Sequence, residues 1–204
     1  MDEVHAWHQY QVSGSEDDLR IPFRQMVDTL VQDAVKHGVK AKISSFRRND
    51  VNHIPPAAKA CGQYLNSILA KIEVTEAGYD EAILLNNNGF VADGSGENVF
   101  IVRRGSLYTP PTSSGALEGI TRDSIIRIAE DMDIPFREKD LVRTDLYLAE
   151  EAFFTGTAAE VVPIREVDDR ELGEPGPMTR RLQEAFFEIV HGRNGRYEKW
   201  LEYV

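Results

Sequence analysis

Lys59 is the residue whose type and surroundings first suggest chemistry. It lies in the run Ile54-Pro55-Pro56-Ala57-Ala58-Lys59-Ala60-Cys61-Gly62-Gln63-Tyr64, where small residues flank it and no neighbour is charged. Desolvation disfavours a charged ammonium, so an enclosed lysine offers a neutral amine that can attack a carbonyl carbon. The run therefore suggests a Schiff-base lysine, although a surface lysine on the first turn of a helix is the simpler explanation of this window alone.

Two carboxylates lie four residues apart in a glycine-rich loop, at Asp93 and Glu97. They could form an acid/base pair, a metal site or an ordinary solvated turn, and the solvated turn is the default for such a loop. Next to a pyridine ring, one carboxylate gains a specific task, because it can keep the ring nitrogen protonated.

Two other segments could hold a phosphate or a carboxylate group. Gly119-Ile120-Thr121 opens an expected helix, whose first N–H groups can bind an anion, although threonine is also common as a plain helix cap. Thr155-Gly156-Thr157-Ala158-Ala159 offers hydroxyls and amides where an expected strand ends, and an ordinary strand-to-turn transition explains it as well.

Other candidate residues carry a weaker signal. Tyr64 is either a core residue or a phenol that donates to a ligand. The five histidines have no metal-ligand spacing, and Cys61 has no nearby histidine or serine partner, so we interpret it as a packing residue. The sequence contains no GxSxG motif and no Walker-type loop. We expect Arg47-Arg48 to be a surface pair rather than a phosphate clamp.

The composition is that of a globular domain. The 204 residues are 42% hydrophobic and 28% charged, with a net charge of −11 that disfavours nucleic acid and anionic membranes as partners. One cysteine permits no internal disulfide, which fits a reducing cytoplasm. We expect no membrane span and no signal peptide.

The patterning predicts alternating strands and helices with hairpins between them. Strands are expected at 39–46, 82–85, 90–92, 99–102, 107–109, 152–157 and 161–167, and helices at 57–76, from 119, and at 179–191. This order indicates an α/β or α+β domain with a mixed sheet.

Taken together and in order, these segments resemble the class IV pyridoxal-phosphate aminotransferases, and most of all the branched-chain amino acid aminotransferases. The matching runs are Ser44-Ser45-Phe46-Arg47-Arg48, Ile54 to Lys59, Gly62-Gln63-Tyr64, Asp93 to Phe100, Gly115 to Asp123, and Thr155 to Glu160. The resemblance implies the D-amino acid aminotransferase-like fold, in which a mixed, partly barrel-like sheet is flanked by helices.

The resemblance also implies a role for each matching residue. Lys59 would be the Schiff-base lysine that moves the proton, Tyr64 would bind the ring oxygen, and Asp93 would face the pyridine nitrogen where the family often has glutamate. The other implied positions are Glu97 as a supporting acid, Leu117 against the ring face, Ile120 and Thr121 on the phosphate, Thr157 as a second phosphate and substrate contact, and Ala158 at the substrate carboxylate.

The sequence departs from the family pattern at its N-terminus. We expect residues 1–18 to be a loose polar lead-in, 19–37 to be a remnant helix of the family's small domain, and 38–204 to be the cofactor-binding large domain. The family's phosphate-binding arginine and N-terminal substrate-binding aromatic have no counterpart. One lost arginine–phosphate contact would weaken cofactor binding by about 1.5–3 kcal/mol.

The expected function is transamination of leucine, isoleucine or valine with 2-oxoglutarate, using pyridoxal 5'-phosphate in a cytoplasmic homodimer or higher homo-oligomer. Two alternatives stay open. One is another class IV reaction, D-amino acid transamination or aminodeoxychorismate cleavage. The other is a catalytically impaired paralogue that binds the cofactor or a partner.

Overall fold

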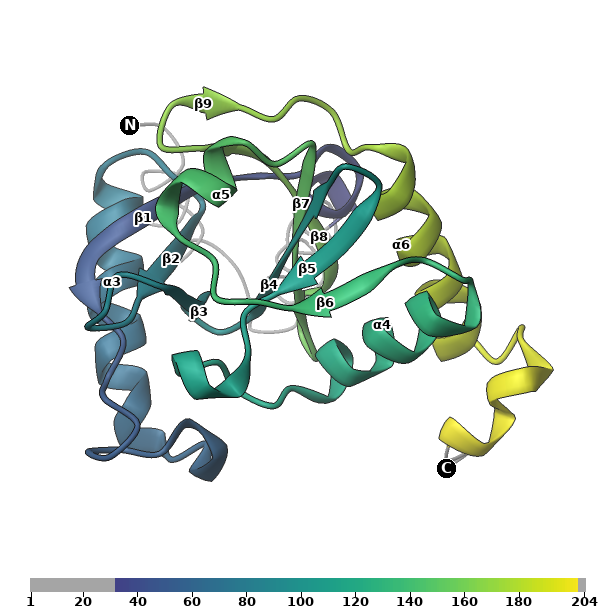
Figure 1. Ribbon diagram of the computed structural model, residues 1–204, viewed down its shortest axis with the longest axis horizontal. Coiled ribbons are helices and arrows are strands. Elements are labelled where there is room, and N and C mark those ends of the chain that lie inside the picture. The colour runs from purple at the N-terminus through teal and green to yellow at the C-terminus, as the bar shows by residue number, and fades with distance from the viewer. Residues whose placement is uncertain (1–31, 202–204) are drawn as a thin grey trace, which may run out of the picture.

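The computed structural model describes residues 32–201 (Figure 1). The expected lead-in at 1–18 and most of the expected remnant helix at 19–37 lie outside these residues. Residues 32–37 are helical, and the carbonyl of Val35 accepts a hydrogen bond of 2.9 Å from the Gln183 side chain. The N-terminal helix is thus tied to the C-terminal part of the chain.

A single mixed sheet runs through the described residues. Eight of its nine strands follow the order β3-β2-β1-β8-β7-β4-β5-β6, and the ninth, β9, pairs with β8 off this path. The pairing of β1 with both β2 and β8 is parallel, whereas β7 pairs antiparallel with both β4 and β8. The strands are β1 (Val39–Arg47), β2 (Glu81–Leu85), β3 (Val91–Gly94), β4 (Asn98–Arg103), β5 (Ser106–Thr109), β6 (Phe136–Glu138), β7 (Glu151–Gly156), β8 (Glu160–Val167) and β9 (Arg170–Glu171).

The two ends of this sheet curl toward each other. Phe90, just before β3, forms an isolated bridge with Val142, which follows β6. Next to it, the Val91 amide donates to the Leu141 carbonyl at 2.7 Å. The expected mixed, partly barrel-like sheet is therefore confirmed.

Strand alternation divides the apolar side chains between two faces. On β4, Val99 and Ile101 point into the core enclosed by the curl, whereas Phe100 and Val102 point outward. The outward set packs under α4 (Ile120–Asp131) and α6 (Pro177–Val190). Burial on both faces explains why the strands read as continuous apolar runs.

Helices α3 (Tyr64–Glu76), α4 and α6 lie on the outside of the curl, whereas α5 (Arg143–Tyr147) packs Leu146 against the core that the curl encloses. In Figure 1, α3 covers β1 and β2 at one end, while α4 and α6 lie at the other end and the short α5 crosses the top. Short 3-10 helices complete the described part: η1 (Pro56–Ala58), η2 (Cys61–Gln63), η3 (Thr112–Ser114) and η4 (Gly195–Trp200). Within residues 32–201, the helices are all too short or too polar to cross a membrane.

Helix α3 packs in an unusual way for an amphipathic helix. It buries the small residues Ser67, Ala70 and Val74 against the sheet. Its large apolar residues instead face outward, and they form what we call the α3 stripe: Tyr64, Leu65, Ile68, Leu69 and Ile72, each at least 41% exposed.

The expected helix at 57–76 is wrong in its first third. The chain forms η1 and η2 before α3 begins at Tyr64. Pro55 and Pro56 start only the short η1, because the backbone turns left-handed at Lys59 and a left-handed residue cannot continue a helix. Lys59 therefore lies in a turn and not on a helix.

Candidate active site

A cavity of about 240 Å³ opens where four segments meet: the approach to α3, the loop from β3 to β4, the start of α4 and the end of β7. Of the nine residues predicted for the site, eight line this cavity, and Ala158 does not. The eight are Lys59, Tyr64, Asp93, Glu97, Leu117, Ile120, Thr121 and Thr157. Segments that are far apart in the sequence thus converge on one place.

Lys59 lies on the rim of the cavity. Its backbone adopts φ 43° and ψ 37°, and its amide donates to the Pro56 carbonyl at 2.9 Å. Its side chain is exposed. The enclosure expected from its small neighbours is therefore absent from the described structure, because Ala57, Ala58 and Ala60 are themselves exposed and too short to cover a lysine.

Asp93 lies at the buried side of the cavity and is only 2% exposed. One carboxylate oxygen accepts from the Asn98 side-chain amide at 2.8 Å, and the other accepts from the Leu117 backbone amide at 2.7 Å. Burial raises the pKa of Asp93 to about 6, against the opposing effect of the nearby Arg48 guanidinium. Asp93 is thus a buried carboxylate held by two hydrogen bonds, with a pKa well above that of a free aspartate.

Arg48 corrects a sequence-based prediction. Arg47 is exposed as expected, but the Arg48 side chain is only 10% exposed. Its guanidinium donates to Asp93 Oδ2 at 3.2 Å and to Ser67 Oγ at 3.0 Å. No signal in its own window could reveal this role, because Asp93 lies 45 residues further along the chain.

Glu97 lies beside Asp93 with its carboxylate partly buried. Its Oε2 accepts from the Gly96 amide at 3.1 Å. Burial raises the pKa of Glu97 to about 7, and the neighbouring Glu81 carboxylate adds to this effect. Glu81 itself is bound by Lys71 at 2.6 Å, and Lys71 does not line the cavity, so this lysine neutralises Glu81 rather than a ligand.

The start of α4 presents backbone N–H groups to the cavity. Gly119 is its N-terminal cap residue, and no side chain caps the helix. Asn98 fixes this end, because its side-chain amide bridges Asp93 and the Leu117 carbonyl, at 2.8 Å each. Ile120 and Thr121 are therefore placed at an uncapped helix N-terminus, which favours an anion.

Asn98 is a site residue that sequence reasoning missed, although it belongs to the matching run from Asp93 to Phe100. Its position directly before an apolar strand makes it look like the end of a loop. Tyr64, by contrast, is expected to be a core residue unless it binds a ligand, and it is 43% exposed. The core interpretation of Tyr64 is therefore wrong.

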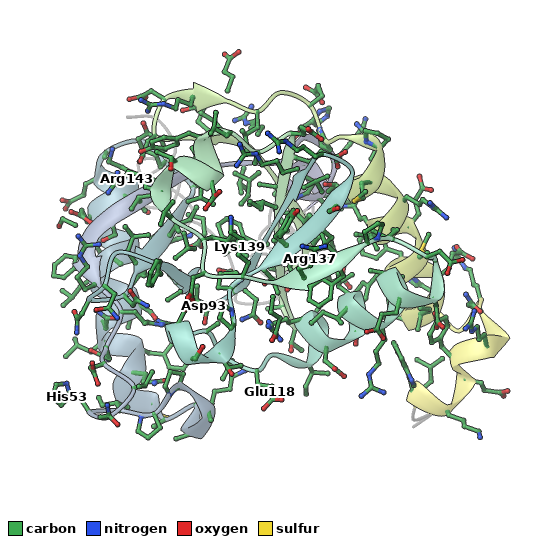
Figure 2. The ribbon with its side chains drawn as sticks, in the orientation of Figure 1. His53, Asp93, Glu118, Arg137, Lys139 and Arg143 are labelled. Atoms are coloured by element: carbon green, nitrogen blue, oxygen red, sulfur yellow. The ribbon has the colours of Figure 1, made fainter. Side chains whose placement is uncertain are left out.

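The described residues contain no cluster of three or more histidine, cysteine, aspartate or glutamate residues that could hold a metal ion. Figure 2 shows Asp93 toward the middle of the molecule and His53 at the outer end of the loop that precedes α3. Asp93 thus stands apart from this histidine.

The curled mixed sheet thus brings a lysine, a buried carboxylate and an uncapped helix N-terminus to one cavity. The family model described as Amino-transferase class IV matches residues 22–167. This chain belongs to the class IV aminotransferase family.

Individual relatives agree with this assignment. The chain is 50% identical over 167 residues to a probable branched-chain-amino-acid aminotransferase of Aquifex aeolicus, covering 80% of this chain and 54% of the relative. It is 47% identical over 174 residues to the branched-chain-amino-acid aminotransferase of Escherichia coli, covering 84% and 56%.

Solved structures give the same result. The Escherichia coli branched-chain amino acid aminotransferase matches with a TM-score of 0.82 and 46% identity, covering 84% of this chain and 57% of that one. The branched-chain aminotransferase of Thermoproteus uzoniensis with norvaline matches with a TM-score of 0.80 and 51% identity, covering 82% and 56%. The chain thus spans a little over half the length of these relatives.

Proposed function

We propose that this chain binds pyridoxal 5'-phosphate in the cavity and transaminates branched-chain L-amino acids with 2-oxoglutarate. The observation that carries the proposal is the convergence of Lys59, Asp93 and the start of α4 on one cavity. These donors match the cofactor's three chemical ends, because an amine suits its aldehyde, a carboxylate its pyridine nitrogen, and free helix amides its phosphate. Among the similar solved structures, the branched-chain amino acid aminotransferase of Thermobaculum terrenum is in its PLP-form.

The cofactor, when bound, supplies an electron-accepting ring that stabilises negative charge on the amino acid's α-carbon. Asp93 keeps the ring nitrogen protonated as long as its own carboxylate is ionised. The Lys59 Nζ takes the α-proton and holds it for return. Lys59 therefore acts in turn as anchor, base and acid.

The remaining predicted residues position the reactants. Ile120 and Thr121 offer backbone amides and a hydroxyl to the phosphate, and Thr157 offers a second contact from the end of β7. Tyr64 offers its phenol to the ring oxygen, and Leu117 packs on the ring face. Ala158 is a proposed contact for the substrate carboxylate, although it lies outside the lining of the cavity.

The exposure of Lys59 favours a second candidate function, in which the chain binds the cofactor without completing transamination. An exposed amine stays in contact with water. It therefore lacks the desolvation that favours a neutral amine able to take a proton. A reaction on D-amino acids or on aminodeoxychorismate is the third candidate from the resemblance.

Absorbance spectroscopy of the purified chain tests these candidates. We expect added pyridoxal phosphate to give a visible band, and borohydride to fix its mass on the peptide that contains Lys59. Lys59→Ala should abolish both signals, whereas Lys36→Ala, which removes an exposed lysine outside the cavity, should leave them intact. A wild-type chain that stays colourless contradicts the proposal.

Amino acids added to the coloured protein separate the candidates further. A spectral change with L-leucine that D-alanine does not produce supports branched-chain transamination. The reverse preference supports the D-amino acid reaction, and no change with either supports binding alone.

We also propose that the chain works as a homodimer in the cytoplasm. The α3 stripe supports association, because five large apolar side chains in a row on an exposed helix face are typical of a protein contact. The lone Cys61 supports a reducing compartment, since the sequence has no second cysteine for a disulfide. Residues 38–204 would form the cofactor-binding large domain, 19–37 a helix of the small domain, and 1–18 the lead-in.

A further inference from the structure

Thr155, near the end of β7, has a buried hydroxyl with nothing to bind. The residue is 1% exposed and lines the cavity. Its Oγ1 is buried and finds no hydrogen-bond partner among residues 32–201. Because buried polar atoms are nearly always paired in native proteins, such a hydroxyl calls for a physical explanation.

The sheet register places this hydroxyl. Thr155 lies directly opposite Asn98 on β4, so the two side chains share one face of the sheet. Asn98 holds Asp93 and the Leu117 carbonyl. Thr155 is therefore at the buried side of the cavity, next to the Asp93 network and the start of α4.

The next pair along the same face shows what packing alone requires. Phe100 and Phe153 lie opposite each other, and their rings stack with centroids 5.1 Å apart beneath α4. One pair further, at the cavity, this apolar column becomes polar at Asn98 and Thr155. Valine has the same shape as threonine and would fill the position without an unpaired hydroxyl, so packing does not explain the threonine.

Thr179 provides an internal comparison. It is 0% exposed, and its Oγ1 also lacks a partner within the described part of the chain. It lies on α6 outside the lining of the cavity, and its backbone amide is bound by Glu151 at 2.6 Å. The combination of an unpaired hydroxyl and a cavity position thus distinguishes Thr155 from Thr179.

We infer that Thr155 is a further cofactor-binding residue, whose hydroxyl donates a hydrogen bond to pyridoxal phosphate at the buried side of the cavity. This inference rests on the proposed function. Thr155 would add a cofactor contact near that of Thr157. Thr155 lies within β7, whereas Thr157 follows the end of the strand.

The test measures binding of pyridoxamine 5'-phosphate to the full chain by calorimetry. This probe has no aldehyde and forms no covalent bond with Lys59, so only noncovalent contacts count. Thr155→Val should bind it about 3- to 10-fold more weakly, the range expected for one neutral hydrogen bond. Thr155→Ser, which keeps the hydroxyl, should bind more tightly than Thr155→Ala, and this pair serves as the measurement if the valine variant does not fold.

Thr179→Val is the matched control, since it removes a buried unpaired hydroxyl that no ligand in the cavity reaches. We expect its affinity for the probe to equal that of the wild type. Both valine variants should melt at or above the wild-type temperature without ligand, because each removes an unpaired buried group. Weaker binding in a more stable protein is a signature that a purely structural role does not produce.

Two results overturn the inference in different ways. If the wild type binds the probe and Thr155→Val binds it equally well, Thr155 makes no contact and the proposed function stands. If the wild type binds neither the probe nor pyridoxal phosphate, the proposed function and this inference fail together.

Discussion

The Arg48 guanidinium and the Asp93 carboxylate form an ion pair of 3.2 Å at the buried side of the cavity, 10% and 2% exposed. The pair joins the residue after β1 to β3, so it links two segments of the sheet at the carboxylate that we propose faces the pyridine nitrogen. Arg48 therefore matters both for folding and for the charge state of Asp93.

Removing Arg48 should destabilise the protein. Arg48→Met leaves Asp93 buried without its cation, and we expect a loss of about 3–5 kcal/mol in the free energy of unfolding, as for other broken buried pairs. Urea denaturation at neutral pH measures this loss. The double variant Arg48→Met/Asp93→Asn should recover part of it, and a double variant as unstable as the single one would show that Arg48 acts through packing instead.

The raised pKa of Asp93 predicts how stability depends on pH. Its pKa is about 6 in the folded chain, against 3.8 for an unperturbed aspartate, so the folded state binds the proton more tightly. The protonated carboxyl therefore contributes on the order of 3 kcal/mol to the free energy of unfolding. This contribution is fully present below about pH 4 and is lost as pH rises through 6. Asp93→Asn should flatten this part of the stability curve.

Protonation of Asp93 should lower the affinity for the cofactor, although it raises the stability of the cofactor-free chain. Below pH 6 Asp93 becomes neutral and no longer favours a protonated ring nitrogen, so affinity for pyridoxal phosphate should fall while apo stability rises. Parallel titrations of melting temperature and cofactor affinity measure the two trends. Glu97, with its pKa raised to about 7, adds to the stability trend, and Glu97→Gln isolates its share.

Gly119 is packed too closely for a side chain. A β-carbon there would clash with Asn98 Oδ1, and Asn98 is held by Asp93 and Leu117. Gly119→Ala should therefore cost about 1–3 kcal/mol of stability and should displace the start of α4, weakening cofactor binding. Gly195→Ala, where a β-carbon meets nothing within 4 Å, is the control that should behave like the wild type in both measurements.

Charges in the α3 stripe should disrupt self-association. Leu65 and Ile68 are 65% and 52% exposed, so Leu65→Glu and Ile68→Glu should fold normally but shift the chain from dimer to monomer. Light scattering after size-exclusion chromatography measures this shift. Leu148→Glu changes a similarly exposed leucine outside the stripe and should leave the dimer intact. A wild-type monomer at high concentration would remove the basis for the proposed dimer.

Local patterns predict the strands and most helices well, because alternation on β1 and apolar runs on β2 and β7 follow directly from burial on one or two faces. They fail where two distant segments decide the outcome. Arg48 is buried because of Asp93, and no pattern near Arg48 contains that information. The large residues of α3 look like a core face in sequence, and only the packing of Ser67, Ala70 and Val74 shows that they point outward.

The order of the site residues along the chain predicts which of them converge, but it does not predict their individual environments. Small neighbours around Lys59 suggest an enclosed amine, but small residues leave a side chain uncovered unless another segment closes over it. The unpaired hydroxyl of Thr155 cannot be foreseen, because it depends on the register between β4 and β7.

The left-handed backbone at Lys59 has a consequence for the evolution of this lineage. A residue with a β-carbon costs about 1–2 kcal/mol in this conformation, whereas glycine costs little and asparagine less than most. Once selection for the amine is relaxed, glycine or asparagine should become fixed at position 59, since either one makes the fold more stable. A gene copy that retains lysine at position 59, despite its lower stability there, therefore indicates that the amine is still under selection.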